Sequence, residues 1–351
     1  MSGAVRRLKA LGLGDSGAFI LKHADYRGNA ADTPSCAIHA PDGADSGDGA
    51  SGRRWRMAIL AAVMCGALAA GQAWAAALEV VDDSGQRITL VGPARRIVSL
   101  APHVTELLFA AGAGNRVVGR VDYSDHPPIA RGLPSVGSYT GVDVEAVLAL
   151  APDLVVGWQG GNRPSDLDRL VRLGLPVYRT DPVMLTDIAA TLRKLGRLAG
   201  TTDRAEAAAQ SFEGGLAELA ASHRAARRVR VFYQVWDQPL MTVGGGHWID
   251  QVITLCGGEN VFAGLRIPTP TVSLEAVLAA APEVILAGGM GGKESAWLAR
   301  WRQWPALPAV RAGHLHAIDP DWLQRAGPRL LLGARAVCGA LDQARADKPA
   351  R

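Results

Sequence analysis

Hydrophobic and polar positions along this chain repeat in nearly the same order in its two halves. The segments read Glu-Ala-Val-Leu-Ala-Leu-Ala-Pro-Asp-Leu-Val-Val from Glu145 and Glu-Ala-Val-Leu-Ala-Ala-Ala-Pro-Glu-Val-Ile-Leu from Glu275, 130 residues further on. Repeats that build solenoids recur about every 20–50 residues, so this longer period indicates two related lobes. Two such lobes would enclose a cleft, and each would carry one equivalent glutamate.

Each copy of the repeat predicts a short helix followed by a buried strand. Asp143 and Ser273 stand two residues before the glutamates and can cap a first helical turn. Pro152 and Pro282 end the helix, and the continuous apolar runs after them are typical of strands covered on both faces. Both lobes are therefore predicted to be α/β.

The two glutamates allow two interpretations. Glu145 and Glu275 can form a functional pair, one on each lobe, or they can simply compensate the positive end of a helix. The second effect is worth about 0.3–1 kcal/mol. The residues alone leave both interpretations open.

The remaining chain alternates further helix and strand patterns, which predicts parallel sheets with helices on both faces in two Rossmann-like lobes. A proline-free stretch, capped by Thr202-Asp203, predicts a helix to about His223. Such a helix is about 30 Å long, enough to join one lobe to the other. The predicted boundaries are an N-terminal lobe at 94–200, a linking backbone helix at 201–227 and a C-terminal lobe at 228–345.

The N-terminal segment carries a secretory signal pattern. Three arginines and a tryptophan at 53–56 precede an apolar run that ends in Ala73-Trp74-Ala75. We therefore expect a signal peptide at 53–75, cleaved near Ala75, with a retained N-terminal anchor as the alternative. Residues 1–52 lack apolar periodicity, which indicates either that translation really starts near Met57 or that these residues form a disordered extension.

Charge excludes one class of partner and cysteine suggests a bridge. Residues 76–351 contain 29 Lys and Arg and 27 Asp and Glu without a basic stripe, so no nucleic-acid partner is expected. Only Cys256 and Cys338 remain after signal removal. An even count in an exported chain predicts a disulfide, with two buried free thiols as the alternative.

Several motifs between Arg96 and Asp342 together resemble one family of transport proteins. They are Arg96-Ile-Val-Ser-Leu-Ala-Pro-His-Val-Thr-Glu-Leu, Tyr123-Ser-Asp-His-Pro-Pro, Trp158-Gln-Gly-Gly-Asn, Cys256-Gly-Gly-Glu-Asn and Asp321-Trp-Leu-Gln-Arg-Ala-Gly-Pro-Arg. The chain is similar to the periplasmic binding proteins of ABC transporters whose lobes are joined by one backbone helix (class III), and most closely to members that bind vitamin B12. The resemblance implies a periplasmic receptor, monomeric when free, that carries cobalamin or a related corrinoid to permease subunits in the inner membrane.

The resemblance also implies roles for particular residues. It assigns ligand contacts to Tyr123, Asp321, Trp322, Leu323, Gln324 and Arg325. It implies that Glu145 and Glu275 dock onto permease arginines, and it supports the bridge between Cys256 and Cys338. The corrinoid is the transported ligand, and no cofactor of the protein's own is expected.

A corrin ring is flat and apolar with amides around its rim, so its cleft needs aromatic walls and polar groups. The candidate walls are Tyr123, Tyr139, Trp158, Trp236 and Trp322, each of which can instead be ordinary core. Trp158 follows a buried strand at the edge where cleft loops arise. Tyr139 and Thr269 stand where the B12-binding members have tryptophan, which keeps another corrinoid, haem or a ferric siderophore as alternative ligands.

Metal and enzyme readings are weaker alternatives. The histidines of residues 76–351 have no tight ligand spacing apart from His314 and His316, so no bound metal is expected; His103, bordering the expected cleft, is the one to test. Gly244-Gly-Gly-His matches no nucleotide-binding pattern, and no nucleophile stands beside a partner in a catalytic motif. We expect no catalytic residues, and an extracytoplasmic chelatase or hydrolase is the alternative of a different class.

Overall fold

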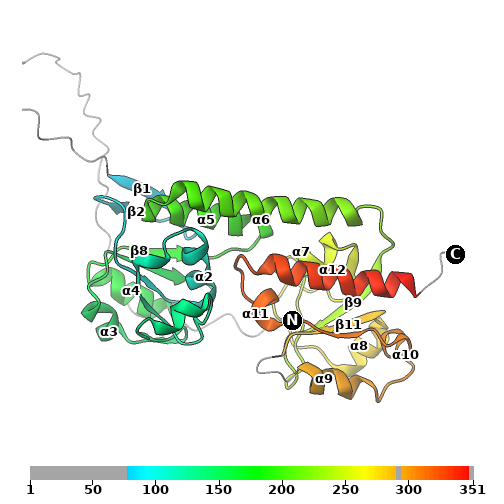
Figure 1. The fold of residues 1–351 in the computed structure, drawn as a ribbon. Coiled ribbons are helices and arrows are strands. Elements are labelled where there is room, and N and C mark those ends of the chain that lie inside the picture. The colour runs from blue at the N-terminus through cyan, green and yellow to red at the C-terminus, as the bar shows by residue number, and fades with distance from the viewer. Residues whose placement is uncertain (1–76, 290–293, 348–351) are drawn as a thin grey trace, which may run out of the picture. The chain divides into compact units, whose positions relative to one another are not determined.

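Residues 73–351 form one compact unit in the computed structural model, which describes residues 77–289 and 294–347 (Figure 1). The predictions made for 1–52 and 53–75 lie outside the described residues. Within the described part, two four-stranded parallel sheets are each flanked by helices, which confirms the α/β prediction for both lobes.

The first sheet has the strand order β4-β3-β7-β8, and every pair in it is parallel. Its strands and helices are β3 (Ile97–Ser99), α2 (Pro102–Ala110), β4 (Val117–Arg120), α3 (Val144–Ala149), β7 (Leu154–Trp158), α4 (Pro164–Arg172) and β8 (Val177–Thr180). A small hairpin of β5 (Gly137–Ser138) and β6 (Gly141–Val142) precedes α3. If these four strands are numbered by their order along the chain, they lie in the sheet in the order 2-1-3-4.

The second sheet repeats that order as β10-β9-β11-β12, again with parallel pairs. Its elements are β9 (Val229–Gln234), α7 (Trp248–Leu255), β10 (Gly258–Asn260), α8 (Leu274–Ala280), β11 (Val284–Ala287), α9 (Glu294–Trp301), α10 (Pro308–Ala312), β12 (Leu315–Ala317) and α11 (Pro320–Leu323). A final helix, α12 (Leu330–Ala346), covers this sheet. The two lobes thus share one topology, as the sequence repeat predicts.

The repeat extends to the backbone conformation. The side chains of Asp143 and Ser273 accept hydrogen bonds from Ala146 N–H at 3.0 Å and Ala276 N–H at 3.2 Å, so both predicted helix caps are confirmed. Ala151 and Ala281, again 130 positions apart, both turn left-handed, with φ of 43° and 44°. Both turns end a helix just before the proline and redirect the chain into a central strand.

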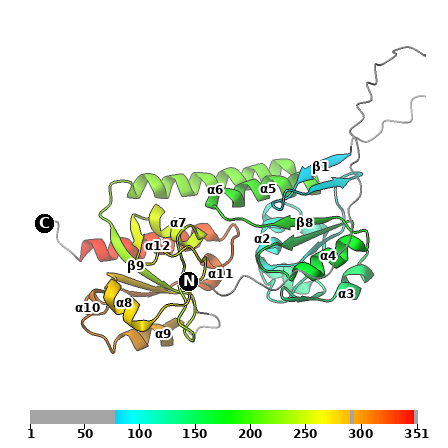
Figure 2. The same ribbon diagram turned by 180° about the vertical axis from the view of Figure 1, so that it is seen from behind.

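One long helix joins the two lobes, as predicted, and a second helix packs antiparallel beside it. The structure places α5 (Leu185–Ala199) and α6 (Thr202–His223) side by side (Figures 1 and 2). The predicted start at 202 and end near 223 agree with α6, but its N-cap residue is Thr201, whose side chain makes no capping hydrogen bond. Arg193 of α5 makes ion pairs with Glu206 at 2.8 Å and Glu213 at 2.6 Å, which join the two helices.

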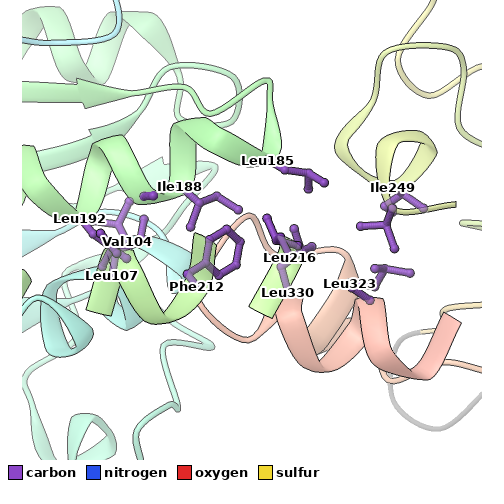
Figure 3. Packing of buried hydrophobic residues seen from close by; sticks show 14 of the residues in the cluster. Val104, Leu107, Leu185, Ile188, Leu192, Phe212, Leu216, Ile249, Leu323 and Leu330 are labelled. Carbon is purple, nitrogen blue, oxygen red and sulfur yellow. The ribbon is translucent and has the colours of Figure 1, made fainter. Parts of the chain in front are cut away.

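One hydrophobic cluster runs from the first sheet to the second. Figure 3 shows Ile188 of α5 near Phe212 of α6, and Leu216 of α6 near Leu330 of α12; the cluster continues to Ile249 of α7. Each of these side chains is buried. The two lobes therefore share one continuous buried core.

The N-terminal hairpin of β1 (Leu78–Val81) and β2 (Arg87–Leu90) was not anticipated from the sequence. Its turn residue Asp83 joins the first lobe, because its carboxylate accepts from Asp181 N–H at 2.8 Å and pairs with Lys194 at 2.7 Å. The first lobe therefore includes residues before the predicted boundary at 94.

A disulfide links Cys256, at the end of α7, to Cys338 in α12, as predicted. The bridge closes a loop across a sequence separation of 82 residues. A disulfide that closes a loop of that length stabilises the fold by about 4 kcal/mol in the chain-entropy model.

Candidate functional site

The two sheets present their topological switch points toward a common region. In open α/β sheets, ligands bind at the carboxyl ends of the strands where the strand order reverses. That point lies between β3 and β7 in the first lobe and between β9 and β11 in the second. Trp158 ends β7, and Gly288 follows β11. Both are therefore expected at a cleft.

A cavity of about 680 Å³ opens at these ends and receives residues from both lobes. Its volume is in the range of small-molecule sites. The first lobe contributes Trp158, Gly160, Asp181, Pro182 and Val183, and the second contributes Val235, Gly245, Gly246, His247, Trp248, Ile249, Arg266, Pro268, Thr269 and Gln324. Two tryptophans with a ring of polar groups suit a large flat ligand that carries a polar rim.

Asn162 organises the aromatic wall of the first lobe. Its side-chain oxygen accepts from Trp158 N–H at 2.7 Å, and its amide nitrogen donates to the carbonyls of Leu100 at 2.8 Å and Tyr139 at 2.7 Å. The Tyr139 ring lies 6.1 Å from the Trp158 ring. One buried amide thus ties together the ends of β3 and β7 and the loop that carries Tyr139.

The Trp158 ring is held on further sides. His103 meets it edge-on, with ring centres 5.0 Å apart, and Asp181 lines the same cavity. Burial, followed by the nearby Arg325 charge, lowers the pKa of His103 to about 3, so this imidazole is neutral. Its Nε2 has no hydrogen-bond partner among the described residues. Burial, followed by the Asp83 charge, raises the pKa of Asp181.

His247 and Trp248 form the opposite wall, at the start of α7. Their rings lie 4.0 Å apart, and the Trp248 indole donates to the Leu323 carbonyl at 3.0 Å. The Nδ1 atom of His247 accepts from Ile249 N–H at 3.1 Å, and burial lowers the pKa of His247 to about 4. A neutral imidazole that accepts at Nδ1 carries its proton on Nε2. His247 is therefore a hydrogen-bond donor at the cavity.

The glycine run before His247 supports a loop of the cavity. A Cβ at Gly244 would lie 2.1 Å from the Ile267 carbonyl oxygen, and one at Gly245 would lie 2.2 Å from that of Ala263. Only glycine allows this close approach. The loop so placed brings Arg266 and Thr269 to the cavity wall.

Gln324, one of the predicted ligand residues, lies at the switch point of the second sheet. Its amide nitrogen donates to the Gly288 carbonyl at 2.5 Å and to the Tyr233 hydroxyl at 3.4 Å. Burial raises the pKa of that tyrosine, which keeps its hydroxyl protonated. Gln324 is thus fixed where β9 and β11 end, opposite Trp158.

The structure brings some predicted residues into the cavity and places others elsewhere. Trp158 and Gln324 line it, and Tyr139 contacts Trp158. Tyr123 is 75% exposed, and Trp236 packs against Trp297 at 5.6 Å; neither lines this cavity.

Within the segment from Asp321 to Arg325, only Gln324 lines the cavity, and the other residues lie elsewhere. Leu323 is fully buried, so its side chain supports the segment from the core and does not face the cavity. Trp322 is half-buried but does not line the cavity. Asp321 and Arg325 form an ion pair at 2.8 Å. Ligand contact by these residues remains a prediction.

The two repeat glutamates differ in their surroundings. Both are exposed on the first turn of their helices. Glu145 makes an ion pair with Arg169 of α4 at 2.7 Å. Hydrogen bonds from its own backbone and from Ser273 lower the pKa of Glu275, which makes no ion pair within the described part of the chain. The first lobe's glutamate is thus partly neutralised.

Sequence reasoning did not assign roles to Asn162, Asp181, His247, Trp248 or Arg266. A signal existed for Asn162, which ends the motif Trp158-Gln-Gly-Gly-Asn. His247 precedes an apolar helical pattern, which is a capping position. Asp181 and Trp248 carried no comparable signal.

Two further properties bear on the class of site. The described residues contain no group of three or more His, Cys, Asp or Glu side chains arranged to hold a metal ion. Within 77–289 and 294–347, no helix combines the length and apolar composition needed to span a bilayer.

Known proteins match this chain over most of its described length. The model of the family described as periplasmic binding protein matches residues 97–322. The vitamin B12-binding protein of Vibrio parahaemolyticus is 37% identical over 246 residues, which cover 70% of this chain and 89% of the relative.

Solved structures support the same assignment. The periplasmic vitamin B12-binding protein of Vibrio cholerae has a TM-score of 0.66 and 37% identity, covering 72% of this chain and 98% of that one. A periplasmic heme-binding protein from Roseiflexus has a TM-score of 0.64 and 27% identity, covering 72% and 99%. The chain therefore belongs to the periplasmic binding protein family.

Proposed function

We propose that this protein captures cobalamin or a related corrinoid in the cavity between Trp158 and His247 and delivers it to an ABC importer. The observation that carries the proposal is this cavity, in which both switch points supply an indole and polar groups to one space. The relatives named vitamin B12-binding protein give the ligand class. The indole rings suit the apolar ring faces, and Gln324 and the Nε2–H of His247 suit rim amides.

The proposal includes export and docking. The signal pattern at 53–75 would send the chain to the periplasm, and residues 1–52 would be removed with it or never made. The lobes at 94–200 and 228–345, joined by the helix at 201–227, would present Glu145 and Glu275 to the permease. The shared core near Phe212 favours a closure of a few degrees.

The proposed ligand set keeps the predicted aromatic residues and adds those of the cavity. Tyr123 and Trp236 are proposed to reach the ligand from the rim. Asp321, Trp322 and Arg325 are proposed as further contacts, with Leu323 acting through its neighbours. No catalytic residue, resident metal or other cofactor forms part of the proposal.

A tryptophan-quenching titration of the purified protein tests this function. Cyanocobalamin, cobinamide, hemin and a ferric siderophore would be compared, because a heme-binding relative has a similar fold. We expect saturable one-to-one quenching by a corrinoid, and we expect the affinity for that corrinoid to be lower in Trp158→Ala. Saturation by hemin or the siderophore alone would overturn the corrinoid assignment, and appearance of a chemically altered product would support the enzyme alternative.

A further inference from the structure

A buried carboxylate of the first lobe is bound by two arginines of the second. Glu106 lies on α2, and its side chain is only 2% exposed. Arg329 donates to it through Nε at 2.9 Å and Nη2 at 2.7 Å, in a bidentate contact. Arg325 donates through Nη1 at 3.1 Å. Both carboxylate oxygens of Glu106 therefore accept hydrogen bonds from arginines of the other lobe.

Two more carboxylates complete what we call the Glu106 cluster: Glu106, Asp125, Asp321, Arg325 and Arg329. Arg325 also contacts Asp125 of the first lobe at 3.1 Å and Asp321 of its own lobe at 2.8 Å. Arg329 lies 3.7 Å from Asp321. Two cations thus stand among three anions, and the contacts cross between the lobes.

The backbone between the two arginines lies against α2. A Cβ at Gly327 would be 3.5 Å from a Glu106 oxygen and 3.7 Å from the His103 Cβ. His103 in turn contacts Trp158, on the cavity wall. Gln324, one residue before Arg325, lines the same cavity. The cluster therefore lies beside the candidate site and connects to both of its walls.

The energetics give the cluster a role in positioning. A buried carboxylate is strongly destabilising unless charged hydrogen bonds compensate its lost hydration. Glu106 receives that compensation only while Arg325 and Arg329 remain beside α2. Any movement of the segment 321–329 away from the first lobe would break bidentate, charge-assisted bonds, which are among the stronger contacts in proteins.

We propose that Glu106 is a positioning residue for the ligand site: through Arg325 and Arg329 it fixes the segment 321–325 and limits separation of the lobes. This inference rests on the proposed function only for the identity of the ligand. Glu106 itself need not touch the ligand. Arg325, which the family resemblance assigns to the ligand, then depends on Glu106 for its orientation.

The variant Glu106→Gln tests the role, because it preserves side-chain size and removes the charge. We expect cyanocobalamin to dissociate about tenfold faster or more, since the segment that carries Gln324 loses the charge-assisted bonds that hold it against α2. Stopped-flow fluorescence would measure the rate. The control is Glu213→Gln, which also removes a carboxylate bound to an arginine, but between α5 and α6. It should leave dissociation within about twofold, as expected for an exposed pair.

Hydrogen exchange in the ligand-free protein separates positioning from general destabilisation. In Glu106→Gln, amides of 320–330 and of α2 should exchange faster, whereas Glu213→Gln should affect α5 and α6 only. Glu106→Asp, which keeps the charge on a shorter side chain, should restore part of both effects. Unchanged exchange at 320–330, or faster exchange with unchanged ligand dissociation, would overturn the positioning role.

The two proposals fail in different ways. If wild-type protein binds no corrinoid, the proposed function is wrong, but the exchange comparison needs no ligand and still tests the Glu106 cluster. The dissociation arm would then use whichever of hemin or the ferric siderophore saturates the wild type.

Discussion

Asn162→Asp is the substitution whose effect follows most directly from the geometry. The aspartate has the same shape, and its carboxylate still accepts from Trp158 N–H. It cannot donate, so the Leu100 and Tyr139 carbonyls lose bonds of 2.8 Å and 2.7 Å. They would instead face a negative charge in a site where Asn162 is only 3% exposed.

The magnitude comes from these two lost bonds. A buried polar group that loses its partner costs about 1–3 kcal/mol, so the free energy of unfolding should fall by about 3 kcal/mol. That is a large share of a typical stability of about 5–15 kcal/mol, but the protein should remain folded. Because Tyr139 is no longer tied to the Trp158 strand, corrinoid affinity should fall as well.

Urea unfolding followed by circular dichroism measures the change, with an unaltered slope confirming that the same surface unfolds. The control is Gln159→Glu, the same chemical change at an exposed neighbour, which should shift stability by less than about 0.5 kcal/mol. If Asn162→Asp lowered the free energy of unfolding by less than about 1 kcal/mol, the two lost bonds would contribute less than buried bonds do, and the reasoning would be refuted.

The remaining predictions concern pH and docking. His103 and His247 have pKa values lowered by burial from 6.5 to about 3 and about 4, so the unfolded chain binds more protons below about pH 6.5. The free energy of unfolding should therefore decrease from about pH 6.5 toward pH 4, and it should decrease less steeply in His247→Gln. Urea titrations at several pH values measure this free energy. A free energy of unfolding that does not change with pH would contradict the burial of neutral imidazoles. Arg169→Ala frees Glu145 and should strengthen permease docking by up to about fivefold in a vesicle-binding assay, since exposed pairs are worth up to about 1 kcal/mol. Glu275→Lys should weaken docking more than Glu145→Lys in wild-type background, and equal effects would show that the Arg169 pair does not matter.

Local chemistry alone predicted much of the fold. Asp143 and Ser273 predicted helix starts, Pro152 and Pro282 predicted helix ends, and the apolar runs after them predicted buried strands. These features depend on residues only a few positions apart. A local stretch of sequence therefore contains all the residues that take part in each interaction. The even cysteine count likewise predicted the bridge, because exported chains rarely keep free thiols.

Helix α5 and the hairpin at 78–90 were not predicted from the sequence. Both stretches contain residues compatible with more than one structure, and packing decided between them. Helix α5 ends at Ala199 because Gly200 takes a left-handed conformation with φ of 61°, and the chain then reverses so that α5 packs on α6 and α2.

The site shows the same division between local and tertiary information. Trp158 could be predicted because it follows a buried strand, and strand ends form clefts in this class of fold. Glu106 and Arg329 could not be paired, because 223 positions separate them and many charges compete for each partner. The sequence by itself therefore determined the repeat of lobes and the elements within that repeat, through short-range capping and hydrophobic periodicity. Only the tertiary structure decided which buried polar groups meet, because burial forces each to find a partner that folding alone brings near.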